Sequence, residues 1–364
     1  MITKNELTPL RSPSKYLCLI GFLMLALFAR AQEFANIEYL CCDWGPAMKL
    51  PRTQGEKPQF SDTKEEVYFL KQVGRFTRGL TGKEEGKGIN IYLCKMKADG
   101  SDKTEIRELW HDVRYPIDTQ AQSTWMDVNE KTHKIALSVT YAGSDVMGLW
   151  TVNLDGSDLK QIIRTEWGQH LVGIDHPSWT PDGQWIVFTE IQRGTHPNQL
   201  RIRKCDSNGK RLSYLTDGPW QQQPAVSPDG SMVVYSQVGD AKTGGLYLMD
   251  IDGHDPHQLP NPDNRRKNHH SGIYPVWSPD GKRILVMGAD GEVIDVDSGK
   301  VLLQRRPMRE GQQWTYGWPH WGKTGIIGFT IDSILLTDTA LKEAKRIGVS
   351  KQMECAKGKE GCVW

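Results

Sequence analysis

Aromatic, basic and amide side chains gather in a few short segments of this 364-residue chain. Aromatic rings stack on the faces of sugars, and an arginine guanidinium binds a carboxylate or sulfate through two parallel hydrogen bonds. This set therefore predicts a site for an anionic ligand, either an acidic glycan or a protein partner. The residues expected to bind it are Arg265, Arg266, Arg305, Arg306, Trp167, His170, Gln223, Gln313, Trp314, Tyr316 and Trp318.

Side chains that can transfer protons raise an enzymatic alternative. Elimination from a uronate-containing oligosaccharide needs a base for the C5 proton, an acid for the leaving oxygen and a cation on the carboxylate. The catalytic candidates are His176, Tyr274 and His320. The candidate ligands of a divalent metal such as Mn²⁺ or Ca²⁺ are His176, Gln312 and His320. Outside this alternative, no cofactor is expected.

Internal repeats must position these residues. Residues 176–188, 223–235 and 274–286 nearly superimpose, and weaker copies begin at Lys57, Gln122 and Trp318, with starts 44 to 65 residues apart. In each strong copy a short strand ends in Pro-Asp-Gly and an apolar, β-branched run follows. Proline presets φ and glycine accepts a positive φ, so the chain reverses there. Each copy predicts a β-hairpin.

The hairpin turns make a local prediction. Gly183, Gly230 and Gly281 should all have positive φ, the conformation that glycine adopts without a steric penalty. A second hairpin follows each first one, with turns such as those beginning at Asp99, Asp155 and Asp252.

Four strands per repeat at this period are typical of β-propeller blades. We predict an all-β fold, a propeller of about six four-stranded antiparallel blades over residues 57–348. The first interval between copies, from Lys57 to Gln122, is the longest and contains an insertion near residues 74–90. It is interpreted as a single blade. A strand at residues 36–42, or one from the tail at 349–364, is expected to complete a terminal blade, because an open ring leaves an unpaired edge.

The Ser-Pro-Asp-Gly hairpin followed by an Asp-Gly-Ser-Asp hairpin resembles the WD-like repeat of TolB propellers, over about residues 57–348. Related propellers occur in prolyl oligopeptidases and oligogalacturonate lyases. The resemblance does not extend to the amino-terminal domain of TolB, so no Tol-Pal role is expected. A Gly-x-Ser-x-Gly elbow is missing, which argues against a peptidase. The stretch from Gly173 to Trp179 is similar to a lyase segment whose histidine binds a metal, and the resemblance gives that role to His176.

In a propeller the loops between the second and third strands of each blade, and the connections between blades, emerge on one face. The turns between the first and second strands and between the third and fourth strands emerge on the opposite face, here called the turn face. Its aspartates are expected to shape the turns: Asp99, Asp102, Asp155, Asp158, Asp182, Asp229, Asp252, Asp255 and Asp280. Blade connections form the other, the loop face, where the ligand residues should surround the mouth of the central channel beside His176 and Tyr274. Trp179, Trp277 and Trp321 are expected to pack between blades.

The amino terminus predicts export. Lys4, Arg11 and Lys15 precede an apolar stretch at 17–28, and small residues then flank Arg30, so residues 1–31 have the pattern of a cleavable signal peptide. No membrane span is expected after its removal, and the predicted location is periplasmic or secreted. Six cysteines remain outside this segment, an even number that permits disulfides in an exported chain: Cys41, Cys42, Cys94, Cys205, Cys355 and Cys362.

Together these features predict an exported propeller that binds an acidic oligosaccharide or an envelope protein on its loop face. A formal net charge of +1 gives no indication of nucleic-acid binding. A lyase acting on uronate-containing oligosaccharides is the first alternative. A scaffold of an envelope complex is the second, and a large exposed apolar patch would support it. The segment at 32–56 joins the signal to the propeller.

Overall fold

A computed structural model gives the structure of the chain. It describes residues 59–61, 65–78, 84–113, 122–141, 144–166, 172–192, 199–238, 244–259, 274–287, 291–305, 317–323, 326–329, 333–337 and 344–349. All of them belong to the unit formed by residues 39–364. The described residues form strands and turns without a helix, so none of them provides the long apolar helix that a bilayer span requires.

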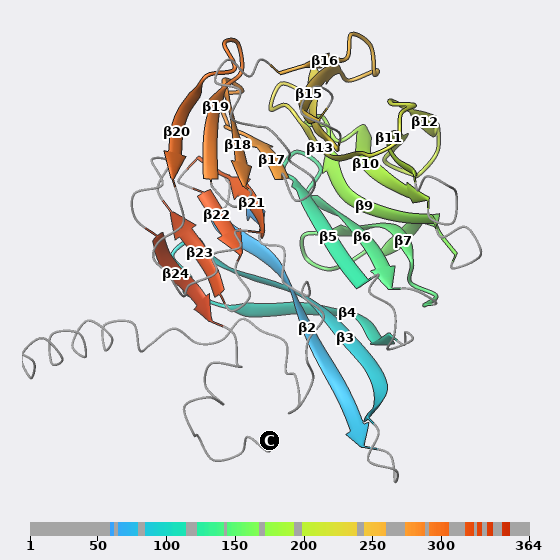
Figure 1. The fold of residues 1–364 in the computed structure, drawn as a ribbon. Coiled ribbons are helices and arrows are strands. Elements are labelled where there is room, and N and C mark those ends of the chain that lie inside the picture. The colour runs from blue at the N-terminus through green and yellow to red at the C-terminus, as the bar shows by residue number, and fades with distance from the viewer. Residues whose placement is uncertain are drawn as a thin grey trace, which may run out of the picture. The chain divides into compact units, whose positions relative to one another are not determined.

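The strands form six antiparallel sheets of four, each built from strands consecutive in the chain (Figure 1). We number these sheets as blades 1 to 6. Blade 1 contains β1 (Gln59–Ser61), β2 (Glu66–Arg78), β3 (Glu84–Lys97) and β4 (Thr104–Val113). Blade 2 contains β5 (Gln122–Asn129), β6 (Lys134–Tyr141), β7 (Gly148–Asn153) and β8 (Lys160–Arg164). Blade 3 contains β9 (Val172–Trp179), β10 (Trp185–Gln192), β11 (Gln199–Asp206) and β12 (Ser213–Tyr214).

The remaining blades repeat the same order. Blade 4 contains β13 (Gln221–Val226), β14 (Met232–Gln237), β15 (Gly245–Asp250) and β16 (His257–Gln258). Blade 5 contains β17 (Tyr274–Trp277), β18 (Arg283–Met287), β19 (Gly291–Asp295) and β20 (Val301–Arg305). Blade 6 contains β21 (Gly317–Trp321), β22 (Ile326–Phe329), β23 (Ser333–Thr337) and β24 (Ala344–Val349).

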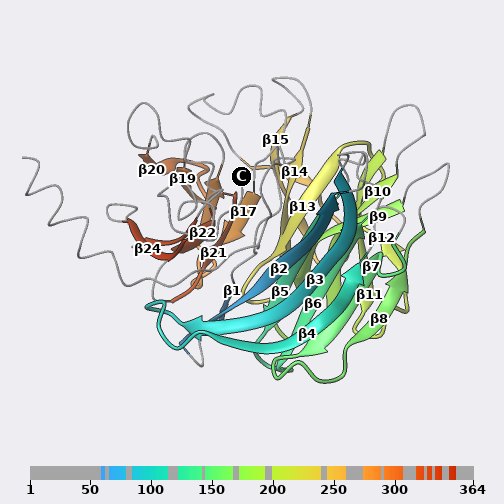
Figure 2. The ribbon, with the colours of Figure 1, turned by 90° about the horizontal axis from the view of Figure 1, so that it is seen from below.

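The first strand of each blade contacts the first strand of the next, and β21 contacts β1, so the six sheets form a closed ring (Figures 1 and 2). The prediction of a six-bladed, all-β propeller is confirmed. The long first interval is a single blade, because its insertion lengthens the β2–β3 hairpin to strands of 13 and 14 residues. The closing strand expected at 36–42 or in the tail lies outside the described residues.

The turn aspartates hold their own hairpins. In each Pro-Asp-Gly turn the aspartate accepts a bond from the hydroxyl two residues before it, and from the backbone N–H two residues after it. The hydroxyl bonds are 2.6 Å for Thr180 to Asp182, 2.6 Å for Ser227 to Asp229 and 2.5 Å for Ser278 to Asp280. These bonds, the hydroxyl bond being the strongest cause, hold the pKa of each carboxyl below its ordinary value. These three aspartates therefore shape their turns, as predicted.

The predicted glycine conformation is also confirmed, since φ is +73° at Gly183, +79° at Gly230 and +70° at Gly281. We expect Gly281→Val to lower the free energy of unfolding by more than about 1 kcal/mol, because a β-branched residue is strained at positive φ. Gly183→Val should cost more, since a Cβ there would lie 2.2 Å from Thr132 Cγ2. Urea unfolding measures both.

Gly281→Asn is the matched control, because asparagine tolerates positive φ better than other side chains. It should retain most of the stability. Equal stability of the valine and asparagine variants would contradict the role given to the turn conformation.

Tryptophans pack between neighbouring blades. Trp179, Trp277 and Trp321 are all buried, and each joins a cluster with apolar side chains of the preceding blade. The clusters pair Trp179 with Ala136 and Leu149, Trp277 with Val234 and Leu246, and Trp321 with Leu285 and Val293. Trp277 Nε1 also donates to Ala225 O at 2.9 Å. The predicted packing role of the three tryptophans is confirmed.

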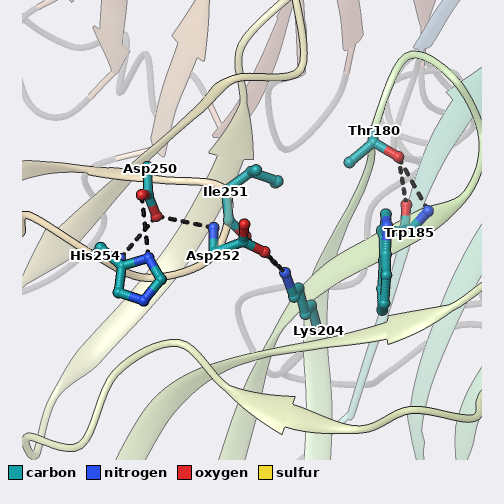
Figure 3. A network of polar contacts seen from close by, with 7 residues as sticks. All are labelled: Thr180, Trp185, Lys204, Asp250, Ile251, Asp252 and His254. Atoms are coloured by element: carbon teal, nitrogen blue, oxygen red, sulfur yellow. Dashed lines mark hydrogen bonds and ion pairs between the residues drawn. The ribbon is translucent and has the colours of Figure 1, made fainter.

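Polar bonds also cross the boundaries between blades. Lys204 of blade 3 donates from Nζ to Ile251 O at 3.1 Å and forms an ion pair with Asp252, both in the β15–β16 turn of blade 4 (Figure 3). In that turn Asp250 accepts from the backbone N–H of Asp252 and of His254, which fixes its conformation (Figure 3). Bonds to an ordered turn can thus align one blade against the next.

Blade 3 contains a buried carboxylate that joins its three outer strands. Glu190 on β10 is 5% exposed and forms an ion pair with Arg203 on β11. It also accepts from Tyr214 OH on β12 at 2.9 Å and from Gln192 Nε2 at 3.1 Å. The guanidinium carbons of Arg203 and Arg201 lie 4.3 and 4.4 Å from the Tyr214 ring centroid.

Two of the six cysteines lie among the described residues. Cys94 and Cys205 are both buried, and burial raises the pKa of the Cys205 thiol to about 12. Neither forms a disulfide. The other four lie outside the described residues, where the predicted disulfides stay a prediction.

Candidate functional site

A cavity of about 490 Å³ lies between the first strands of the blades. It is lined by residues of β1, β5, β9, β13, β17 and β21, so every blade contributes to it. The lining also includes Lys131, Pro181, Pro228 and Pro279 from the hairpin turns. The cavity therefore follows the central channel and reaches the turn face.

Three rings from different blades stack within this cavity. The ring centroids of Trp125 on β5 and His176 on β9 are 3.5 Å apart, with their planes tilted by 36°. Tyr274 on β17 stacks on both, at 5.8 Å from Trp125 and 5.7 Å from His176. Blades 2 and 5 lie opposite each other in a ring of six, so this aromatic bridge crosses the channel.

Two backbone bulges turn side chains of neighbouring blades toward the channel. His176 has a φ of +53° and Gln223 a φ of +59°, values that few non-glycine residues adopt. The pairing register shifts beside both residues, between Val187 and Thr189 in blade 3 and between Gln222 and Ala225 in blade 4. Bulges commonly redirect a side chain next to a functional site, and backbone strain gathers at such sites.

Gln223 is held through both its backbone and its side chain. Its backbone N–H donates to Thr189 Oγ1 of blade 3 at 3.0 Å, and its Oε1 accepts from Ser236 Oγ at 3.1 Å. The residue is 5% exposed. The bulge position of blade 4 is therefore rigid, which suits a side chain that orients a ligand.

A partly buried acid lies in the same cavity. Asp127 is two residues after Trp125 on β5, so both side chains point to the same side of the strand. Desolvation is the main cause that raises the pKa of Asp127 to about 7. Two backbone hydrogen bonds oppose the rise only in part: the N–H of Trp179 donates to Oδ2 at 2.6 Å, and the N–H of Val128 donates to the same carboxyl. This carboxyl is therefore able to exchange a proton near neutral pH.

The remaining charged groups of the cavity lie at its turn-face end. Glu130 and Lys131 follow β5, Lys323 follows β21, and His320 lies on β21. Groups of three or more histidine, cysteine or acidic side chains that could hold a metal are absent from the described part of the chain.

The structure brings four of the predicted site residues together: His176, Gln223, Tyr274 and His320 all line the cavity. Arg305 ends β20 and Trp318 lies on β21, but their side chains are outside the described set. The other candidates lie outside the described residues: Arg265, Arg266, Arg306, Trp167, His170, Gln312, Gln313, Trp314 and Tyr316.

The described lining of the cavity reaches the turn face. Most of the ligand residues predicted at the loop-face mouth lie outside the described residues, so their place there stays a prediction. Sequence reasoning missed Trp125 and Asp127, which belong to a weak copy of the repeat. The sequence alone did not mark them, because the register of β5 follows from its pairing with β6, in which Ser138 lies opposite Trp125.

Comparison with known proteins finds similarities over parts of the chain. No protein-family model matches the chain. The chain is 29% identical over 156 residues to the uncharacterized protein Atu1656 of Agrobacterium fabrum, covering 40% of this chain and 48% of that protein. It is 31% identical over 103 residues to the Tol-Pal system protein TolB of Francisella tularensis, covering 28% of this chain and 22% of TolB. The chain thus spans half or less of the curated relatives it matches.

Solved structures give more distant similarities. An oligogalacturonate lyase in complex with manganese has 14% identity and a TM-score of 0.48, over 80% of this chain and 76% of that chain. TolB from Acinetobacter baumannii has 12% identity and a TM-score of 0.41, over 78% and 82%. With the repeat and the sheet topology, the chain carries a TolB-like β-propeller.

Proposed function

We propose that this chain is an exported β-propeller that binds an acidic oligosaccharide in its central channel. The aromatic bridge of Trp125, His176 and Tyr274 is the observation that carries the proposal, because it gathers three rings from different blades inside a cavity. Concave sites lined by aromatic side chains with a few fixed polar groups are typical of small-molecule binding. Gln223 and His320 supply the polar groups beside the rings.

The acidic character of the ligand rests on the loop-face arginines. Blade connections contain Arg265, Arg266, Arg305 and Arg306, and β20 ends at Arg305, where the chain leaves blade 5 toward blade 6. A sugar stacked in the channel would present its carboxylates to these guanidiniums. Export rests on the signal-like residues 1–31, which precede the described part. A protein partner of the same charge is the competing ligand.

We expect the double change Arg265→Ala and Arg305→Ala to weaken binding of a uronic-acid trisaccharide at least tenfold. Partly desolvated hydrogen bonds to charged groups contribute on the order of 1.5–3 kcal/mol each, so losing two suffices. Rising salt should weaken binding to the unchanged protein. Isothermal titration calorimetry measures both effects.

The neutral trisaccharide of the same length is the ligand control, and Lys210→Ala, at a β11–β12 turn away from the cavity, is the protein control. Unchanged affinity in the arginine variant would reject the acidic site. Equal binding of neutral and acidic sugars would leave a sugar site with no preference for charge, and would contradict the proposal.

A lyase remains the second candidate, supported by one observation. His176, Tyr274 and His320, the three candidates for proton transfer, line the same cavity. Imidazole and phenol groups fit the base and acid that elimination needs. Of the metal candidates, the two histidines lie in the cavity and Gln312 lies outside the described residues. An ultraviolet assay for unsaturated product, with and without Mn²⁺ or Ca²⁺, separates lyase activity from binding alone.

The scaffold alternative receives less support. The large apolar side chains that are exposed among the described residues are Leu212, Tyr214, Trp220 and Leu302. Leu212 and Tyr214 lie in blade 3, Trp220 lies in the connection between blades 3 and 4, and Leu302 lies in blade 5. A contiguous apolar patch, which marks many protein interfaces, would need these residues side by side.

A further inference from the structure

The carboxyl of Asp127 has a setting unlike that of any other described acid of the propeller. Most described aspartates lie in exposed turns, where hydrogen bonds stabilise the carboxylate. Asp127 instead lies on the inner strand β5 and lines the channel cavity. Its one hydrogen bond from another blade comes from an uncharged donor, the Trp179 backbone N–H. No basic side chain of the described residues forms an ion pair with it.

These contacts determine how a neutral carboxyl would be oriented. The Trp179 N–H donates to Oδ2 at 2.6 Å and has a larger effect on this carboxyl than the Val128 N–H, so the proton of the neutral acid belongs on Oδ1. That O–H is then available to donate within the cavity. An ionised carboxylate at the same place would instead repel an anionic ligand. Burial favours the neutral form, and a bound ligand that displaces water would favour it further.

We propose that Asp127 is a specificity-determining residue of the cavity, which in its neutral form donates a hydrogen bond to an acidic sugar. The inference rests on the proposed function and deepens it, since it says how an acid can belong to a site for an acidic ligand. Binding then requires the protonated carboxyl. Where Asp127 is ionised before binding, it takes up one proton for each ligand bound.

Other titratable groups line the same cavity and must be separated from Asp127. They are Glu130 and Lys131 beside β5, His176 on β9, Tyr274 on β17, and His320 and Lys323 on and after β21. Loss of the proton from either histidine would also weaken binding of an acidic ligand as pH rises. Only a variant at Asp127 itself can assign the effect.

The test compares the affinity of the unchanged protein and of Asp127→Asn for a uronic-acid trisaccharide between pH 5.5 and pH 8.5. Asparagine reproduces the neutral acid, because its oxygen can accept from Trp179 N–H and its amide can donate. With the pKa at about 7, affinity of the unchanged protein should fall about thirtyfold from pH 6 to pH 8.5. Asp127→Asn should remove most of that fall, and Glu130→Gln should leave it in place.

A ligand-free measurement accompanies the titration. Because the folded pKa of Asp127 is raised, its stabilising contribution is present below the ordinary aspartate pKa and is lost as pH rises through about 7. Urea unfolding should therefore show a loss of stability over that interval that Asp127→Asn lacks. An equal pH dependence of affinity in both proteins would overturn the inference while leaving the sugar site intact. Absence of binding at every pH in both proteins would reject the proposed function, and the inference with it.

Discussion

Replacement of Trp125 by alanine is expected to reduce the affinity for an acidic trisaccharide about a hundredfold, with the fold retained. Trp125 has the largest ring of the aromatic bridge and contacts both of the other rings. Truncation of a buried aromatic residue at the centre of a binding site commonly costs 2 kcal/mol or more. Trp125 belongs to none of the described apolar clusters between blades, so its loss should affect binding more than stability.

Two variants make this result specific. Trp125→Phe keeps a ring in the channel and should recover part of the affinity. Trp185→Leu removes a tryptophan whose ring contacts Lys204 and Arg211 on blade 3, away from the cavity, and should leave binding unchanged. Titration calorimetry and thermal unfolding together separate the two effects. If Trp125→Ala bound the trisaccharide as well as the unchanged protein, the channel would not be the sugar site.

The largest effect on stability is expected at Glu190. Glu190→Ala should lower the free energy of unfolding by about 3–5 kcal/mol, because it leaves the guanidinium of Arg203 unpaired in a largely buried place. The change also removes the acceptor of the Tyr214 hydroxyl, so the edge strand β12 loses its contact with β10. Urea unfolding at constant pH gives the measurement.

The double change Glu190→Leu and Arg203→Met is the control. Replacing both members of a buried ion pair by apolar side chains is often neutral or stabilising, so the double variant should be more stable than Glu190→Ala. A loss under about 1 kcal/mol for Glu190→Ala would show that solvent reaches Arg203 and replaces the carboxylate.

The hairpin turns could be predicted from the sequence, because they depend on contacts between residues that are close together in the chain. The Ser-Pro-Asp-Gly turns contain their own hydrogen bonds, so Gly230 and its equivalents could be placed at positive φ without knowledge of the rest of the chain. The spacing of these turns then gave the blade count. Trp179 and Trp277 could be assigned to the packing between blades because they occupy the same position in two strong copies of the repeat.

The site was predicted less fully because it depends on contacts between blades. Blade 2 lacks the Pro-Asp-Gly turn and uses Asn129 to Thr132 instead, where Asn129 Oδ1 accepts from Thr132 N at 2.8 Å. Without a Pro-Asp-Gly turn to mark the end of the strand, the register of β5 could not be determined from the sequence. The inward direction of Trp125 could therefore not be predicted. The raised pKa of Asp127 likewise depends on enclosure by the neighbouring blade.

The sheet topology has a consequence for how such a chain can change in evolution. In the described part of the chain every sheet is made of four consecutive strands, and neighbouring sheets meet through side chains and a few polar bonds. The unit that a gene duplication copies is then the same as the unit that folds into a sheet. Gain or loss of one repeat would add or remove a whole blade and leave the backbone ladders of the others intact. The ring size can therefore vary between descendants more readily than the design of any one blade.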